Sequence, residues 1–226
     1  MIVALVAVIL GVVAGVNLWV PSVASSYKLP WAAGGTYAVL QGNYSTQAMG
    51  GCVSGCGTHD DNAMRYAWDF DLPEGTEVLA ARGGTVALMN GNWRPDHCGG
   101  TTESEAGPIT SALIGNEANF VQIAHGDGTS ALYLHLSEVA PSIERKAVTG
   151  EPVLQGELLG LSGKTGYTQC VPHLHFQVES SVPADWFTTS LPITFADPDV
   201  TSRTPLGVPE EGQAYLSDNA PLAATG

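Results

Sequence analysis

The chain has 226 residues, of which 22 are acidic and 8 are basic, and its formal net charge is −14 at pH 7. This length allows one sizeable hydrophobic core with flanking segments. Because no stretch concentrates Lys and Arg, the chain has nothing to neutralise a row of phosphates, and we exclude nucleic acid as a partner. The 27 glycines and 14 prolines favour strands, turns and loops over long helices.

Residues 1–25 begin with an apolar run of roughly 20 residues, which is the length of a hydrophobic helix that crosses a bilayer. Ser22, Val23 and Ala24 resemble the small-residue end of a signal peptide, although no Lys or Arg precedes the run. A cleaved signal peptide and a retained membrane anchor therefore both stay open. Either one predicts that the rest of the chain is exported and faces the cell wall, touching the membrane only through this segment.

Four cysteines follow, at positions Cys52, Cys56, Cys98 and Cys170. In an exported protein they favour two disulfides over a zinc cluster. Three connectivities are possible, and the spacing does not choose among them. One of them pairs Cys98 with Cys170, which would pin the loop that leads into His173.

Residues 26–58 lack periodicity and are interpreted as a linker or N-terminal arm, followed by a domain over residues 59–182. Alternating patterns predict strands over 66–72, 77–80 and 85–89, the last two forming a hairpin around Arg82 and its following glycines.

The clearest hairpin joins residues 120–125 to residues 131–136 across a Gly-Asp-Gly-Thr turn. Alternation places Tyr133 and His135 on one face of its second strand. A short turn or helix is expected near 138–146. Residues 183–226 contain six prolines and are predicted to form a tail, part of which packs on the core while its end is mobile.

The last strand of the domain carries the most informative pattern. Its polar face consists of His173, His175, Gln177 and Glu179, and its apolar face of Leu174, Phe176 and Val178. The two imidazoles lie about 7 Å apart along a flat strand, which is too far for them to chelate one ion easily. One histidine can bind a metal while the other reaches a water or substrate beside it. Two ordinary surface histidines are the alternative interpretation.

Asp69 is expected to point inward from the 66–72 strand. A buried charge is costly unless it is paired, so Asp69 predicts a partner: a metal ion, backbone N–H groups or Arg65. A catalytic zinc ion takes three protein ligands from His, Asp, Glu or Cys and keeps the fourth position for water. The chain offers six histidines for such a site.

Four ordered blocks of the sequence resemble the lysostaphin/LytM-type zinc peptidases. They lie within residues 66–86, 119–136, 160–166 and 172–176, and the last contains the His-Leu-His-Phe run. The resemblance implies a mainly β fold, a compact antiparallel sheet or barrel-like domain (the duplicated hybrid motif) with long loops. The N-terminal hydrophobic helix lies outside it.

The family holds one zinc ion with a His, an Asp and the second His of the His-x-His pair, and the last two correspond here to Asp69 and His175. The first ligand departs from the common pattern, because Arg65 stands four residues before Asp69 where His is usual. A branch of the family carries this His further upstream, and His59 fits that placement. His135 and His173 fall on the family's two active-site histidines that do not bind the metal.

A zinc ion held by His59, Asp69 and His175 would lower the pKa of a bound water and polarise the scissile carbonyl. We assign His173 as the general base and His135 as a hydrogen-bond donor to the oxyanion, and an exchange of these two roles stays open.

We therefore expect a monomeric zinc metalloendopeptidase that hydrolyses stem peptides or cross-bridges of bacterial peptidoglycan. One alternative is a catalytically inactive relative that binds the cell wall or regulates another hydrolase. A second alternative is a metal-binding β domain that is not a peptidase.

Overall fold

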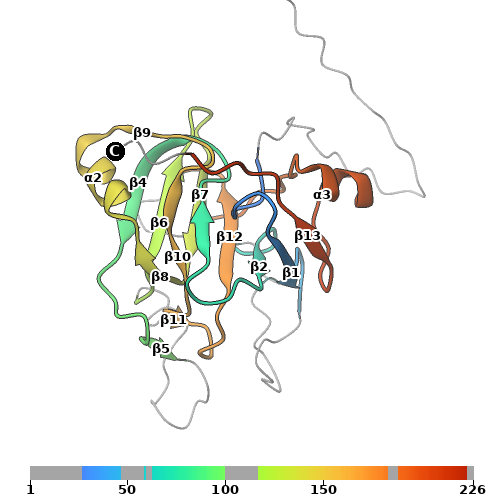
Figure 1. Ribbon diagram of the computed structural model, residues 1–226, viewed down its shortest axis with the longest axis horizontal. Helices are drawn as coiled ribbons and strands as arrows, with labels where there is room; N and C mark the ends of the chain where they lie inside the picture. The colour runs from blue at the N-terminus through green and yellow to red at the C-terminus, as the bar shows by residue number, and fades with distance from the viewer. Residues whose placement is uncertain (1–26, 47–58, 60–62, 100–116, 183–187, 223–226) are drawn as a thin grey trace, which may run out of the picture.

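The computed structural model describes residues 27–46, 59, 63–99, 117–182 and 188–222. The fold is mainly β, as predicted, and is built from antiparallel sheets (Figure 1). The predicted signal peptide or anchor at residues 1–25 lies outside the described residues, and so do Cys52 and Cys56. Within the described ranges, no helix combines the length and apolar character needed to cross a membrane.

Eight strands form the larger sheet, in the order β13-β1-β2-β12-β7-β6-β4-β9. They are β1 (Thr36–Gln41), β2 (Trp68–Phe70), β4 (Gly84–Asn90), β6 (Phe120–Ala124), β7 (Ser130–Leu134), β9 (Pro152–Val153), β12 (Leu174–Glu179) and β13 (Ala214–Leu216). Every pairing in this sheet is antiparallel. Because β12 lies between β2 and β7, three strands that are distant in sequence bring their side chains to one place.

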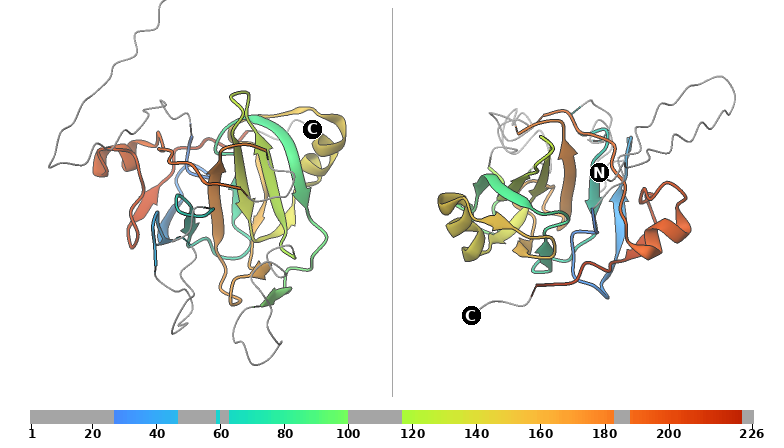
Figure 2. Two further views of the ribbon diagram at one scale, coloured as in Figure 1. Left: turned by 180° about the vertical axis from the view of Figure 1, so that it is seen from behind. Right: turned by 90° about the horizontal axis from the view of Figure 1, so that it is seen from above.

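Two smaller sheets also occur among the described residues. The order β3-β10-β8 is built from β3 (Glu77–Leu79), β8 (Leu136–Val139) and β10 (Leu158–Ser162). A parallel pair joins β5 (Cys98–Gly99) to β11 (Gly166–Tyr167). The helices α2 (Pro141–Thr149) and α3 (Pro198–Arg203) lie at opposite ends of the larger sheet (Figures 1 and 2).

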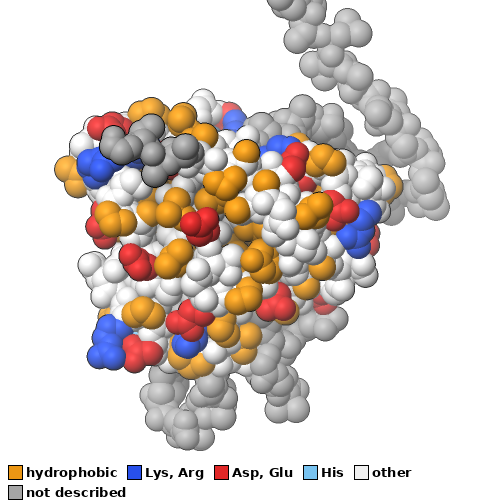
Figure 3. Space-filling view, in the orientation of Figure 1, with side chains coloured by type: hydrophobic (Ala, Val, Ile, Leu, Met, Phe, Trp, Pro, Cys, Tyr) orange, Lys and Arg blue, Asp and Glu red, His pale blue; other side chains and the backbone are white. Residues whose placement is uncertain are grey.

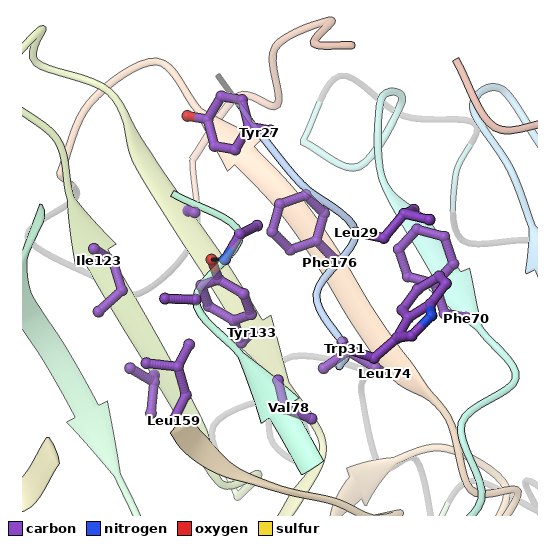
Figure 4. Packing of buried hydrophobic residues seen from close by; sticks show 14 of the residues in the cluster. Tyr27, Leu29, Trp31, Phe70, Val78, Ile123, Tyr133, Leu159, Leu174 and Phe176 are labelled. Carbon is purple, nitrogen blue, oxygen red and sulfur yellow. Dashed lines mark hydrogen bonds between the residues drawn. The ribbon is translucent and has the colours of Figure 1, made fainter. Parts of the chain in front are cut away.

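The main core lies between the eight-stranded and three-stranded sheets (Figure 4). Ile123, Tyr133 and Phe176 of the larger sheet belong to one buried cluster with Val78 and Leu159 of the smaller one. Burying a side chain of this size stabilises the fold by about 1.5–3 kcal/mol. A second apolar cluster contains Ala118, Phe120, Leu132 and Leu134. Since every residue of β12 is buried, its polar side chains need hydrogen-bond partners inside the protein.

The structure confirms the hairpin predicted over residues 120–136, because β6 pairs with β7. It also confirms the apolar face of the last strand, whose three residues all belong to the main core. The hairpin predicted around Arg82 is wrong. Here β3 pairs with β10, and β4 pairs with β6 and β9. A Cβ at Gly84 would overlap the carbonyl oxygen of Ala124, so this glycine allows close packing of β4 on β6 rather than a tight turn.

The predicted linker does not hold for residues 27–46. Strand β1 pairs with both β2 and β13, and Tyr27, Leu29 and Trp31 are buried in the main core. The predicted tail packs on the domain over residues 188–222, more extensively than expected, and Phe195 and Tyr215 are buried there. Periodicity missed both segments, because their core contacts come from single aromatic and aliphatic residues separated by turns.

One buried carboxylate ties these two segments together. Asp197 accepts hydrogen bonds from the backbone N–H of Leu29 at 2.8 Å and of Asp218 at 2.9 Å. On the face seen in Figure 3, acidic and basic side chains are interspersed among apolar ones, and neither charge gathers into a single patch.

Candidate functional site

His59, Asp69 and His175 come together where β2 pairs with β12 in the larger sheet. Their ligand atoms all lie within 4.8 Å of one another, and all three residues are buried. Asp69 on β2 is the register partner of His175 on β12, and Oδ1 of Asp69 lies 2.9 Å from Nδ1 of His175. His59 enters from a turn before β2, with its Nε2 atom 3.5 Å from Oδ2 of Asp69. The sheet and one turn thus place two imidazoles around one carboxylate.

The ring of His59 is oriented by the backbone. Its Nδ1 atom lies 2.9 Å from the carbonyl oxygen of Gly42 and donates a hydrogen bond to it. In the neutral ring the lone pair therefore sits on Nε2. This Nε2 atom is buried, and no hydrogen-bond partner for it exists in the described part of the chain. A buried acceptor that faces a carboxylate calls for a positive charge between the two groups.

The ring of His175 has the opposite orientation. Its Nε2 atom lies 3.0 Å from Oε1 of Gln177, an oxygen that can only accept, so Nε2 carries a proton. The Nδ1 atom then points at the carboxylate of Asp69, which requires either a proton on Nδ1 or a bound cation. Two imidazole nitrogens and one carboxylate are ligands that zinc prefers, and three protein ligands leave one position for water. The residues present therefore fit a zinc ion.

The charges of this cluster are strongly coupled. Burial opposes ionisation of Asp69, but the imidazoles of His59, His173 and His175 together hold its pKa well below the ordinary value. Burial also disfavours the charged form of His59, yet the Asp69 carboxylate and the Gly42 carbonyl raise its pKa above the ordinary value. Asp69 is thus an ionised centre for which protons and cations compete.

His135 and His173 lie beside the three-residue cluster. Their ring centroids are 4.7 Å apart, and Nε2 of His173 is 3.8 Å from Oδ1 of Asp69. In each ring Nδ1 donates to a carbonyl oxygen, of Thr165 at 2.7 Å for His135 and of Val171 at 2.9 Å for His173. Each neutral ring therefore has its basic lone pair on Nε2.

Burial is the largest influence on both of these imidazoles. Together with the charges of His173 and His175, it pulls the pKa of His135 well below the ordinary value. Burial also lowers the pKa of His173, but the Asp69 carboxylate opposes this effect. A proton in this pair is therefore better stabilised on His173, the ring beside Asp69, than on His135.

His135 reaches the site through a break in strand geometry. Its φ is 72°, a left-handed conformation that is uncommon outside glycine. The simple alternation predicted for this hairpin therefore ends at Leu134. Tyr133, predicted to share the face of His135, is buried in the main core, and its hydroxyl oxygen accepts a hydrogen bond from the Ala81 N–H.

A disulfide bond anchors the loop whose carbonyl groups orient His135 and His173. Cys98 is bonded to Cys170, which is one of the pairings that the sequence left open. The parallel pair β5–β11 runs beside it, with a hydrogen bond from Gln169 N–H to the carbonyl oxygen of Gly99. The loop over residues 165–171, which supplies both carbonyls, is thus attached covalently and by hydrogen bonds to residues 97–99.

The remaining histidines lie elsewhere. His97 stacks on Trp93 with ring centroids 4.3 Å apart, and His125 contacts the carbonyl oxygen of Gly83. Sequence reasoning placed Gln177 and Glu179 on the polar face of the last strand but gave them no role. A sequence signal for such a role existed. Gln177 and Glu179 continue the face of the strand that carries His173 and His175, while the opposite face is apolar.

Comparison with known proteins shows that residues 63–185 match Peptidase family M23, and the match begins just after His59. The peptidoglycan DD-endopeptidase ShyA of Vibrio cholerae is 30% identical over 110 residues, covering 49% of this chain and 19% of that protein. An uncharacterized metalloprotease of Haemophilus influenzae is 28% identical over 109 residues, covering 48% of this chain and 17% of that protein. The chain thus spans less than a fifth of the length of either relative.

Two solved structures are also similar. A mutant catalytic domain of EnpA, a prophage-encoded M23 protein from Enterococcus faecalis, has a TM-score of 0.41 at 16% identity, covering 68% of this chain and 88% of that one. A zinc-containing peptidase from Vibrio cholerae has a TM-score of 0.41 at 21% identity, covering 73% of this chain and 41% of that one. Because the family match spans more than half of the sequence, the chain belongs to peptidase family M23.

Proposed function

We propose that the protein is a zinc metalloendopeptidase that hydrolyses peptide bonds in bacterial peptidoglycan. The convergence of His59, Asp69 and His175 is the observation that carries this proposal. Among the described residues, Nε2 of His59 has no hydrogen-bond partner, and it lies 3.5 Å from Oδ2 of Asp69. Membership of peptidase family M23 supports the reaction class. The similarity to a peptidoglycan DD-endopeptidase supports the substrate class, either stem peptides or cross-bridges.

In this proposal His59, Asp69 and His175 hold one zinc ion. When bound, the ion supplies a Lewis acid and brings the pKa of water towards neutrality. His173 acts as the general base, because the nearby Asp69 carboxylate stabilises the imidazolium that forms when its Nε2 takes a proton. His135 is the proposed hydrogen-bond donor to the carbonyl oxygen of the substrate. Because its Nδ1–H is held by Thr165, it can donate only from Nε2, and burial opposes the protonation of that atom. An exchange of the two roles is the alternative mechanism.

We also propose that the protein acts outside the cytoplasm as a monomer. The apolar segment at residues 1–25 supports export, either with cleavage or with retention as an anchor. The wall-directed relative in Vibrio cholerae supports the same compartment.

The test uses the full chain, purified in a mild detergent because its N-terminus is apolar. Zinc content is measured by atomic absorption, and peptide release from wall sacculi by mass spectrometry. We expect one zinc per chain and released peptides for the wild type, and neither for His175→Ala. His97→Ala, which changes a histidine outside the site, is the matched control and should retain both. Wall binding without peptide release would instead favour an inactive, wall-binding relative.

A further inference from the structure

A line of buried polar side chains continues from His175 along β12. Gln177 accepts from Nε2 of His175 at 3.0 Å and donates from its own Nε2 to Oε1 of Glu179 at 2.8 Å. Glu179 also accepts from the side-chain amide of Gln122 and from the backbone N–H of Thr188. Gln122, Gln177 and Glu179 are each 0% exposed. Bulk solvent therefore does not reach these groups, and their orientations depend on one another.

The carboxyl group of Glu179 sets the orientation of the neighbouring side chain of Gln177. Burial raises its pKa, and the hydrogen bonds from Thr188, Gln177 and Gln122 oppose that effect. The backbone N–H of Thr188 can only donate, and it shares Oε1 of Glu179 with the NH₂ group of Gln177, so this oxygen acts as an acceptor. The geometry therefore suits an ionised carboxylate, which accepts hydrogen bonds and donates none.

The carboxylate decides which way the amide of Gln177 points. An acceptor at Glu179 needs the NH₂ group of Gln177, so the amide oxygen must turn to His175. That oxygen in turn needs a proton on Nε2 of His175, which leaves the lone pair on Nδ1, beside Asp69. If the amide were reversed, its NH₂ group would face Nε2 of His175, and the proton would move to Nδ1, where a cation would have to bind.

We propose that Gln177 and Glu179 are positioning residues that hold His175 in its Nε2–H tautomer and so prepare Nδ1 to bind the metal. This inference rests on the proposed function, because it assumes that His175 is a zinc ligand. Groups that orient a metal ligand typically change metal affinity by about 10–100-fold when they are removed.

The test measures the zinc dissociation constant of the full chain in detergent, by competition with a chromophoric chelator. Gln177→Met keeps a long side chain but removes the acceptor for His175, and we expect about 10–100-fold weaker zinc binding. Gln122→Met is the matched control. It removes one buried donor from the same carboxylate, yet Gln177 must still donate to Glu179, so zinc affinity should stay at the wild-type value.

A charge-swapped double variant, Gln177→Glu with Glu179→Gln, separates orientation from general loss of structure. It again presents an acceptor to Nε2 of His175, so most of the lost zinc affinity should return. The melting temperature of the metal-free protein is measured in parallel, since a purely structural role would lower it in Gln177→Met without a matching loss of zinc affinity. A double variant that binds zinc as weakly as Gln177→Met would overturn the proposal.

Failure of the proposed function and failure of this inference give different results. If the wild-type chain binds no zinc, both are wrong. If the wild type binds zinc through His175 while Gln177→Met binds it equally well, only the role of Gln177 and Glu179 is overturned.

Discussion

Asp69 and His175 are register partners on adjacent antiparallel strands, and their side chains meet at 2.9 Å on a buried face. Directly opposite residues in such a pair have Cβ atoms about 4.5–5.5 Å apart, so the backbone ladder itself fixes this contact. The third member of the cluster, His59, comes from a turn and depends on one hydrogen bond to Gly42. The cluster therefore combines two strand-borne groups with one group held by a turn.

His59→Ala is expected to remove zinc from the protein, because it deletes one of three ligands. Removing a residue that only orients a ligand typically weakens metal binding by about 10–100-fold, and the loss in His59→Ala should be larger. Zinc titration checks this prediction. Arg65→Ala is the control, since Arg65 occupies the position where the family's first ligand is usual, and it should leave zinc affinity unchanged. If Arg65→Ala lost zinc while His59→Ala kept it, the first ligand would have to lie near residue 65.

His173→Ala and His135→Ala should lower the rate of peptide release while the protein keeps its zinc. Removing a general acid or base typically slows a reaction by about 10²–10⁴-fold. Zinc content and peptide release are measured on the same preparations. If either variant lost its zinc, that histidine would have to be counted among the ligands.

Zinc affinity should fall as the pH falls. The pKa of His59 is raised by Asp69 and Gly42, so its ring is protonated below that raised value in the metal-free protein, and zinc must then displace a proton. Each displaced proton weakens binding by about tenfold per pH unit below the pKa of the group. Chelator competition between about pH 8 and pH 5 measures the slope. A dissociation constant that did not change with pH would rule out histidine ligands.

Removing the Cys98–Cys170 disulfide should impair catalysis more than zinc binding. The bond closes a loop of sequence separation 72, for which chain entropy alone gives about 4 kcal/mol of stabilisation. It also holds the loop whose carbonyls orient His135 and His173, whereas the three proposed ligands are oriented by Gly42, Gln177 and one another. A double Cys→Ser variant should therefore keep its zinc and lose activity. Equal losses of both would argue against a specific effect on the two histidines.

Asp197→Ala should destabilise the fold without touching the site. It leaves the N–H groups of Leu29 and Asp218 without their acceptor, and each buried unsatisfied group costs about 1–3 kcal/mol. Urea denaturation measures the free energy of unfolding, with the exposed Asp71→Ala as the control. A variant as stable as the control would show that residues 27–31 and 217–219 do not depend on this carboxylate.

The strands near the site were predictable because the sequence alternates there. The β6–β7 hairpin and the apolar face of β12 follow from period-two patterns and a glycine-containing turn. The segment around β1 was not predictable in this way. Trp31 and Tyr27 are single buried anchors in a Gly- and Ala-rich stretch without periodicity, and only the tertiary partners Phe70 and Phe176 reveal their role.

The sequence indicated which side chains lie together here but not how their rings are oriented. Residue types and resemblance suggested three metal ligands and two further histidines; the structure brings these five side chains together, and their roles stay a proposal. Tautomers depend on carbonyls supplied by Gly42, Thr165 and Val171, which no side-chain pattern marks. The left-handed turn at His135 also escaped prediction, because alternation was extended one residue too far.

One zinc ion shared by His59, Asp69 and His175 is the feature on which the proposed function depends, and anomalous X-ray diffraction at the zinc absorption edge tests it most directly. We predict one strong peak in zinc-loaded crystals, bonded to Nε2 of His59, a carboxylate oxygen of Asp69 and Nδ1 of His175. A peak at any other set of side chains, or zinc-soaked crystals without a peak between these three residues, would contradict it.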